Sequence, residues 1–138
     1  MKYCNILILS FCLFTLISCN TNDTETEQLS ENDTVQYAVT IEMTDVTFEP
    51  DHVTIIEGET VRWINTSQVT HTVTADSGLA VDNSNVILPR GAEPINSGSL
   101  APGEIFDYRF DVPGLYRYFC VPHEAAEMVG EVLVETQN

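Results

Sequence analysis

From residue 35 onwards, hydrophobic side chains recur at every second position in one short segment after another. In the first of these segments the alternating positions are Tyr37, Val39, Ile41 and Met43. A period of two places successive side chains on opposite faces of an extended chain, so each segment predicts a half-buried β-strand. Turn signals rich in Gly, Pro, Asp and Asn separate the segments. The pattern therefore favours an all-β architecture.

Similar segments follow along the rest of the chain. They are Val53 and Ile55; Val61, Trp63 and Asn65; residues 70–74; Phe106, Tyr108 and Phe110; Tyr116, Tyr118 and Cys120; and residues 131–134. Roughly seven or eight short strands without an amphipathic helix indicate an antiparallel Greek-key β-sandwich of about eight strands. Residues 75–103 are less regular and predict either a short helix or a long loop. Trp63, the only tryptophan, is expected to anchor the core.

The N-terminal residues predict export and a lipid anchor. Lys2 precedes a mostly apolar run that is too short to span a bilayer and ends in Leu-Ile-Ser-Cys at Cys19. We expect residues 1–18 to be a lipoprotein signal peptide and Cys19 to carry lipid. Residues 19–34 are polar and acidic, which predicts a disordered tether, and the folded domain is expected at 35–136. The expected location is a bacterial membrane, with the domain on its periplasmic side.

The charge is strongly acidic, with 5 basic and 21 acidic residues and a formal net charge of −16. Binding to nucleic acid is disfavoured, because neutralising phosphates requires a basic face. Two explanations of the acidity stand side by side: attraction to a basic partner protein, and solubility in salty surroundings.

A short loop near the C-terminus carries three potential metal ligands. Cys120, His123 and Met128 supply a thiol, an imidazole and a thioether. Cys120 is the only cysteine that remains in the domain after the signal peptide is removed and Cys19 is acylated, and metal ligation is one explanation of such a thiol. Thiolate and thioether favour Cu(I), and imidazole accommodates Cu(II), so this set suits copper better than zinc.

A second imidazole must come from elsewhere in the chain. His52 follows Pro-Asp at a strand start, where a solvated surface position is expected. His71 lies in a β-branched segment that can run beside the strand ending at Cys120. Assigning His71 gives two histidines, one cysteine and an axial methionine, a set that indicates blue copper.

These motifs resemble the plastocyanin and pseudoazurin branch of the cupredoxins. The resemblance rests on residues 120–123 (Cys-Val-Pro-His), 128–130 (Met-Val-Gly) and 116–119 (Tyr-Arg-Tyr-Phe), with His71 upstream. It implies an eight-stranded sandwich with one type 1 copper per chain, held by His71, Cys120 and His123 with Met128 as a weak axial ligand. Thr72 departs from the Asn that often follows the first ligand in this family, so the link between the two ligand segments is in question.

The resemblance implies a one-electron carrier and not an enzyme. The expected partners are redox proteins such as c-type cytochromes, an oxidase or a reductase, and the chain is expected to be a monomer. The expected electron path is the edge of His123, with the neighbouring small apolar residues as a docking patch bordered by Glu124 and Glu127. Pro122 has no N–H to donate to the Cys120 sulfur, which predicts a lower potential than in a relative with a donor there.

Two other functions are possible for a copper site on such a fold. A catalytic copper enzyme would need further imidazoles, and only His52 remains after His71 and His123 are assigned. A periplasmic copper carrier or chaperone on the same fold is the alternative to the electron carrier. Such carriers tend to expose Met-rich and His-rich clusters, whereas this domain has only Met43 and Met128.

Overall fold

The computed structural model describes residues 36–137, so the predicted signal peptide (1–18) and tether (19–34) lie outside the described residues. The strands are β1 Tyr37–Met43, β2 Phe48–Glu49, β3 His52–Ile56, β4 Thr60–Asn65, β5 Thr74–Ala75, β6 Ile95–Asn96, β7 Ile105–Arg109, β8 Gly114–Phe119 and β9 Val129–Glu135. Two short 3₁₀ helices, η1 Asn83–Asn85 and η2 Val121–Ala126, complete the regular structure. None of the helices in this part of the chain is long and apolar enough to cross a membrane.

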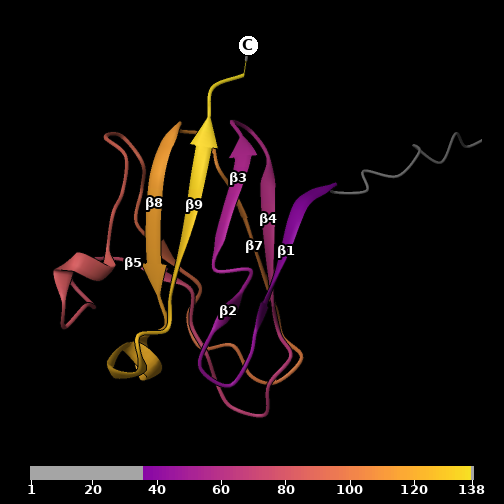
Figure 1. Cartoon of the computed structure of the whole chain (residues 1–138), viewed down its shortest axis with the longest axis vertical. Coiled ribbons are helices and arrows are strands. Elements are labelled where there is room, and N and C mark those ends of the chain that lie inside the picture. Colours follow the sequence, from indigo (N-terminus) through magenta and orange to yellow (C-terminus); the bar gives the residue numbers. More distant parts are fainter. Residues whose placement is uncertain (1–35, 138) are drawn as a thin grey trace, which may run out of the picture. The chain divides into compact units, whose positions relative to one another are not determined.

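The strands form two sheets packed as a sandwich (Figure 1). One sheet has the order β2-β1-β4-β7 and the other β3-β9-β8-β5-β6. The predicted β-sandwich is confirmed. The expectation of purely antiparallel pairing is wrong, because β1 pairs with β4 and β3 pairs with β9 in parallel. Alternation along a strand determines which side chains face inward, whereas the direction of the neighbouring strand depends on where the chain crosses between sheets.

The inward positions of the strands meet in one aromatic core. Trp63 on β4 is fully buried, as expected, and its ring lies edge-on to Tyr118 of β8 at 5.4 Å between centroids. Phe110 and Tyr116 are also buried and in edge-on contact at 4.8 Å. Edge-to-face packing of this kind adds to the stabilisation from burial alone. The core therefore joins β4 of one sheet to β8 of the other.

A glycine lets β9 run close to this core. A Cβ atom at Gly130 would collide with the Tyr118 ring and its hydroxyl. Gly130 pairs directly with Tyr118 across the β8–β9 ladder, two residues after Met128. The bare backbone at this position allows the strand leaving the ligand loop to lie flat against the aromatic core.

The irregular segment 75–103 contains both structures that the sequence allowed. It includes the one-turn helix η1, the strand β6 and a long loop. Besides the pairing of β6 with β5, two isolated backbone bridges fasten this segment to the sandwich, from Ile87 to Arg117 and from Leu100 to His71. Figure 1 shows η1 beside β8 and η2 beyond the end of β8. The loop thus reaches the same end of the sandwich as the predicted ligand loop.

Candidate metal centre

Cys120 ends up inside the domain because of the alternation along β8. Tyr116 and Tyr118 point inward, and Cys120 continues the same face one residue beyond the strand. Its side chain is fully buried, and its thiol forms no disulfide within the described residues. A buried thiol at a strand end, where the chain turns into η2, faces the residues of the loops that close this end of the sandwich.

His71 reaches Cys120 from the neighbouring segment. Two backbone hydrogen bonds with Leu100, of 3.0 and 2.8 Å, hold the histidine in an isolated β-bridge. Its ring is fully buried, and Nδ1 lies 3.5 Å from the Cys120 sulfur. The two residues are 49 positions apart in sequence and are brought together only by the fold.

His123 approaches the same sulfur from within η2. Its backbone N–H donates to the Cys120 carbonyl at 3.0 Å, which turns the loop back over the thiol. Nδ1 of His123 lies 3.3 Å from the sulfur, and its ring is 4.8 Å from the ring of His71. Unlike His71, the ring is only partly buried. His123 is therefore the imidazole of this group that connects the interior with the surface.

Met128 closes the base of the loop. Its backbone carbonyl accepts from the Cys120 N–H at 3.0 Å, and its own N–H donates to the His123 carbonyl at 3.3 Å. The residue is 1% exposed. The fold thus gathers all four predicted ligand residues at one end of the sandwich, and the axial role of the thioether stays a prediction.

The donor set fits a copper ion. Among the described residues, His71, Cys120 and His123 form the only group of this kind, with their ligand atoms within 4.8 Å of one another. Bonds from nitrogen and thiolate sulfur to a metal of this size are about 2.0–2.3 Å, so two ligands of one ion lie roughly 3–4 Å apart. The observed nitrogen–sulfur separations of 3.5 and 3.3 Å agree with that requirement. One thiol with two imidazoles is also the equatorial set that selects blue copper.

Thr72 joins the two ligand segments. Its backbone N–H points at the Cys120 sulfur at 3.3 Å, and its hydroxyl accepts from the Val121 N–H at 2.9 Å. The Thr74 hydroxyl donates to the same oxygen at 3.0 Å. The link that the sequence left in question is therefore present, with a hydroxyl oxygen in place of an amide.

A buried polar chain orients the other side of the His71 ring. Nε2 lies 2.9 Å from the Ser67 hydroxyl, which in turn donates to the Asn65 side-chain carbonyl at 2.8 Å. The Asn65 amide donates to the backbone carbonyls of Val69 and Leu100. With Nε2 carrying the proton, Nδ1 is left as the free acceptor that faces Cys120.

Sequence reasoning missed the role of Asn65 and Ser67. The available signal was Asn65 itself, which continues the inward alternation of Val61 and Trp63 and is 1% exposed. A buried amide must find hydrogen-bond partners, and here it finds them around the first imidazole.

Burial shifts the pKa values of His71 and Cys120 in the protein without metal. Desolvation, followed by the nearby His123, lowers the pKa of His71, which keeps that ring neutral and able to bind a metal. Desolvation also raises the pKa of the Cys120 thiol, against the hydrogen bonds from Thr72 and His123. Metal binding needs the thiolate, so loading this site releases a proton.

Glu124, expected at the border of the docking patch, also connects two segments of the chain. Its carboxylate accepts from the backbone N–H groups of Val81 and Asp82 at 2.9 Å each, and from the Asn85 side chain at 3.1 Å. Although desolvation opposes the change, these hydrogen bonds hold the pKa of Glu124 below its usual value. Glu124 therefore fastens the η1 loop to η2, and its charge is already engaged within the molecule.

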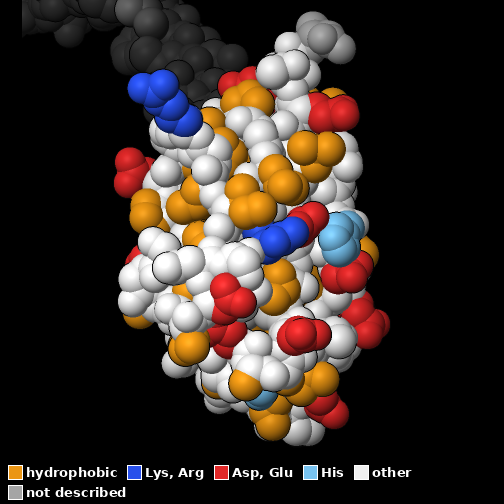
Figure 2. All heavy atoms as spheres, turned by 60° about the vertical axis from the view of Figure 1, so that its left-hand side comes forward, with side chains coloured by type: hydrophobic (Ala, Val, Ile, Leu, Met, Phe, Trp, Pro, Cys, Tyr) orange, Lys and Arg blue, Asp and Glu red, His pale blue; other side chains and the backbone are white. Residues whose placement is uncertain are grey.

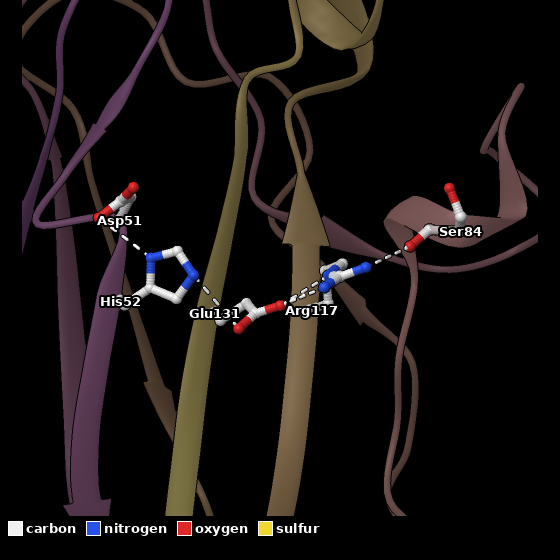
Figure 3. Close-up of polar contacts among 5 residues, drawn as sticks. All are labelled: Asp51, His52, Ser84, Arg117 and Glu131. Atoms are coloured by element: carbon white, nitrogen blue, oxygen red, sulfur yellow. Dashed lines mark hydrogen bonds and ion pairs between the residues drawn. The ribbon is translucent and has the colours of Figure 1, made fainter.

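His52 lies outside the metal centre, as expected. Figure 3 shows its ring between Asp51 and Glu131, at 3.1 and 3.3 Å, on the outer face of β3 and β9. Glu131 continues the chain of contacts to Arg117 at 2.7 Å, and Arg117 donates to the Ser84 carbonyl at 3.0 Å. The third histidine thus takes part in a surface network that reaches across β8 to η1.

The relatives of this chain among known proteins are copper-binding proteins and plastocyanins. A family model described as copper binding proteins of the plastocyanin/azurin family matches residues 35–135. Plastocyanin from Scenedesmus fuscus is 38% identical over 88 residues, which are 64% of this chain and 86% of that protein. Chloroplastic plastocyanin from Oryza sativa subsp. indica is 37% identical over 87 residues, which are 63% of this chain and 54% of that protein. The match thus spans only about half of the rice protein.

Solved structures show the same fold. The purple cupredoxin from Nitrosopumilus maritimus is similar with a TM-score of 0.55 and 27% identity, over 70% of this chain and 99% of that one. A mutant of amicyanin in its Cu(I) form is similar with a TM-score of 0.58 and 23% identity, over 75% of this chain and 87% of that one. At that identity, the likeness to amicyanin bears on the fold alone.

Proposed function

This chain belongs to the plastocyanin/azurin family of copper-binding proteins, and we propose that it carries single electrons between redox proteins while tethered to a membrane. Members of this family that resemble plastocyanin are blue copper electron carriers and not enzymes. Copper bound at this site, the cofactor that the sequence predicted, would supply one-electron chemistry between its Cu(I) and Cu(II) states. The proposed ligands in this chain are His71, Cys120, His123 and Met128.

The single observation that carries the proposal is the convergence of one buried thiol with two imidazoles. His71 and His123 direct Nδ1 at the Cys120 sulfur from opposite segments, at 3.5 and 3.3 Å. Each ligand residue is held by hydrogen bonds that do not involve a metal, through Leu100, Thr72 and the backbone of η2. A prearranged set of this kind limits the movement that accompanies a change of oxidation state, and this favours rapid electron transfer.

His123 is the proposed electron path. It is the partly exposed imidazole of the group, and Val121, Pro122 and Ala125 beside it are exposed. Small apolar side chains around an imidazole edge suit brief contact with another redox protein. C-type cytochromes, a terminal oxidase or a reductase are the proposed partner classes.

The membrane part of the proposal rests on the sequence before the described residues. Cys19 follows a short apolar run in the manner of a lipid-modified cysteine, and the acidic residues after it suit a flexible tether. We propose that the domain works on the periplasmic side of a bacterial membrane, close to respiratory partners. Labelling with a radioactive fatty acid, compared between the native chain and Cys19→Ala, tests this part separately.

The decisive experiment is to load the purified protein with Cu(II). An intense blue thiolate-to-copper absorption band, narrow copper hyperfine splitting and reversible one-electron reduction are expected. Cys120→Ser is the matched control, since it removes the thiolate and should abolish the blue band. A colourless copper-loaded protein would contradict the proposal, and release of copper on reduction would favour a carrier or chaperone of copper itself.

A further inference from the structure

A hollow of about 410 Å³ lies between the η1 loop and η2, immediately beside the metal centre. Its apolar lining comes from Val81 on the loop and from Val121, Pro122 and Ala125 on η2. Its polar lining consists of Asp82, Asn85, Glu124 and Glu127, and no Lys or Arg lines it. Its volume falls within the range of pockets that hold small ligands or single side chains.

The hydrophobic part of this hollow is open to solvent. Val81 is 95% exposed, and Val121 is 40% exposed. Figure 2 shows hydrophobic and acidic side chains together at the lower end of the molecule, and no Lys or Arg at that end of this face. Because Val81 and Val121 line the same hollow, their exposed apolar surface is gathered at one place and not scattered singly over the molecule.

Both walls of the hollow are fixed in place. The Glu124 carboxylate on η2 binds the N–H groups of Val81 and Asp82 on the loop. At the base of the loop, Arg117 donates to the Ser84 carbonyl (Figure 3). The backbone of Arg117 also pairs with that of Ile87. Because these contacts exist without any partner, the hollow is preformed, which lowers the entropic cost of binding.

We propose that this hollow receives the side chain of a lysine or arginine from the redox partner. A long cationic side chain has an apolar stem and a charged head, which matches the mixed lining of valines, alanine and carboxylates. The residues of η2 in the lining flank His123, so an occupied hollow places the partner's surface beside the proposed electron path. The inference rests on the proposed electron-carrier function and adds the chemistry by which the partner is selected.

The charges disfavour two other occupants. An anionic lipid surface would be repelled by Asp82 and Glu127, and a second copy of a chain with a net charge of −16 would be repelled as a whole. A basic partner meets neither obstacle, and complementary charge would raise its association rate at low ionic strength.

The test compares two pairs of neutralising substitutions in the copper-loaded protein. The hollow variant is Asp82→Asn with Glu127→Gln; asparagine keeps the helix cap that Asp82 provides to the Ser84 N–H. The control variant is Asp111→Asn with Glu135→Gln. Both control residues are exposed and lie at the other end of the sandwich. Glu135 follows Val134, which pairs with Gly114 at the start of β8, and Asp111 lies in the segment just before Gly114.

Electron transfer to a basic and to an acidic c-type cytochrome is measured by stopped flow. With the basic cytochrome at low salt, the hollow variant should be slower than the native protein by roughly 3–10-fold, and the control variant should stay within about twofold. The difference should vanish near 1 M salt, where charges are screened within about 3 Å. The acidic cytochrome should show no loss.

Val81→Lys provides an independent check, because an almost fully exposed side chain can be changed without disturbing the fold. It should slow the reaction with the basic cytochrome and leave the blue band unchanged. Equal rates for the hollow and control variants, or an equal loss with both cytochromes, would overturn the hollow as a cation site. Failure of the native protein to form a blue, ascorbate-reducible centre would instead overturn the electron-carrier function.

Discussion

The hydroxyl oxygen of Thr72 accepts a hydrogen bond of 2.9 Å from the backbone N–H of Val121. Thr72 directly follows His71, and Val121 lies between Cys120 and His123, so this bond ties the interior ligand segment to η2. Thr72 is 9% exposed. A hydrogen bond in such a buried position fixes the His71 segment relative to η2, and with it the positions of both imidazoles around the thiol.

Replacing Thr72 with valine should loosen this connection. The substitution leaves the Val121 N–H without its partner, which should cost about 1–3 kcal/mol of unfolding free energy. Chemical denaturation of the copper-free protein measures the loss. Thr72→Ser retains the hydroxyl and should recover most of the stability; equal losses in the two variants would show that the methyl group matters and the hydrogen bond does not.

Pro122→Ala should raise the midpoint potential of the copper-loaded protein. Proline has no N–H, so residue 122 adds no donor to the Thr72 N–H that points at the Cys120 sulfur at 3.3 Å. An additional donor would withdraw charge from the thiolate and favour Cu(I). A bond of about 1 kcal/mol corresponds to ~40 mV for one electron. Voltammetry provides the measurement, and an unchanged or lower potential would remove this account.

Ser67→Ala should weaken copper binding without touching a ligand. His71 Nε2 loses its hydroxyl partner at 2.9 Å, so the ring is held less firmly in the orientation that presents Nδ1. Losing such a partner typically costs 10–100-fold in metal affinity. Competition with a copper chelator measures the change. Ser99→Ala, at an exposed serine outside this chain of contacts, is the control and should bind as tightly as the native protein.

Glu124→Ala should release the η1 loop. The N–H groups of Val81 and Asp82 lose their acceptor, so their hydrogen exchange should become faster by at least about tenfold, as expected when roughly 1.4 kcal/mol of local protection is lost. Amide exchange followed by NMR reads both positions directly. Glu93→Ala removes an exposed carboxylate in the same loop region and should leave their exchange unchanged. Unaltered exchange in Glu124→Ala would show that other contacts hold the loop.

Without copper, the protein should lose stability in mildly acidic solution. Desolvation, followed by the charge of His123, lowers the pKa of His71 in the folded state. Below about pH 6.5 the unfolded chain therefore binds more protons at this residue, and the free energy of unfolding falls as the pH falls. Thermal unfolding between pH 8 and 5 measures this slope. His71→Gln should flatten it, and an unchanged slope in that variant would assign the effect to other groups.

The fold class could be predicted from the sequence because side-chain alternation is a local property. Ile41, Trp63 and Tyr118 all lie inside, as the period of two required. The parallel pairing of β1 with β4 could not be predicted in this way, since alternation is the same for either direction of the neighbouring strand.

The metal centre also has a part that local sequence predicts and a part that depends on the fold. Cys120, His123 and Met128 were recognisable because they share one short loop and a combination of side chains that suits copper. His71 was identified by elimination among three histidines and by family resemblance, and the fold brings its Nδ1 to 3.5 Å from the thiol. The sequence left the link at Thr72 open, because a threonine hydroxyl connects two segments only where a hydrogen-bond donor faces it, and the fold places the Val121 N–H there.

By itself, the sequence determined which residues face the core and which side chains are available to copper, because both depend on residue type and local spacing. Only the tertiary structure decided what surrounds the metal centre. Ser67 behind His71 and Glu124 beneath the η1 loop work through partners that lie 4 and about 40 positions away. Hydrogen bonds act over about 3 Å, so their partners are known only once the fold has fixed where each side chain lies, whether the two residues are near or far apart in sequence.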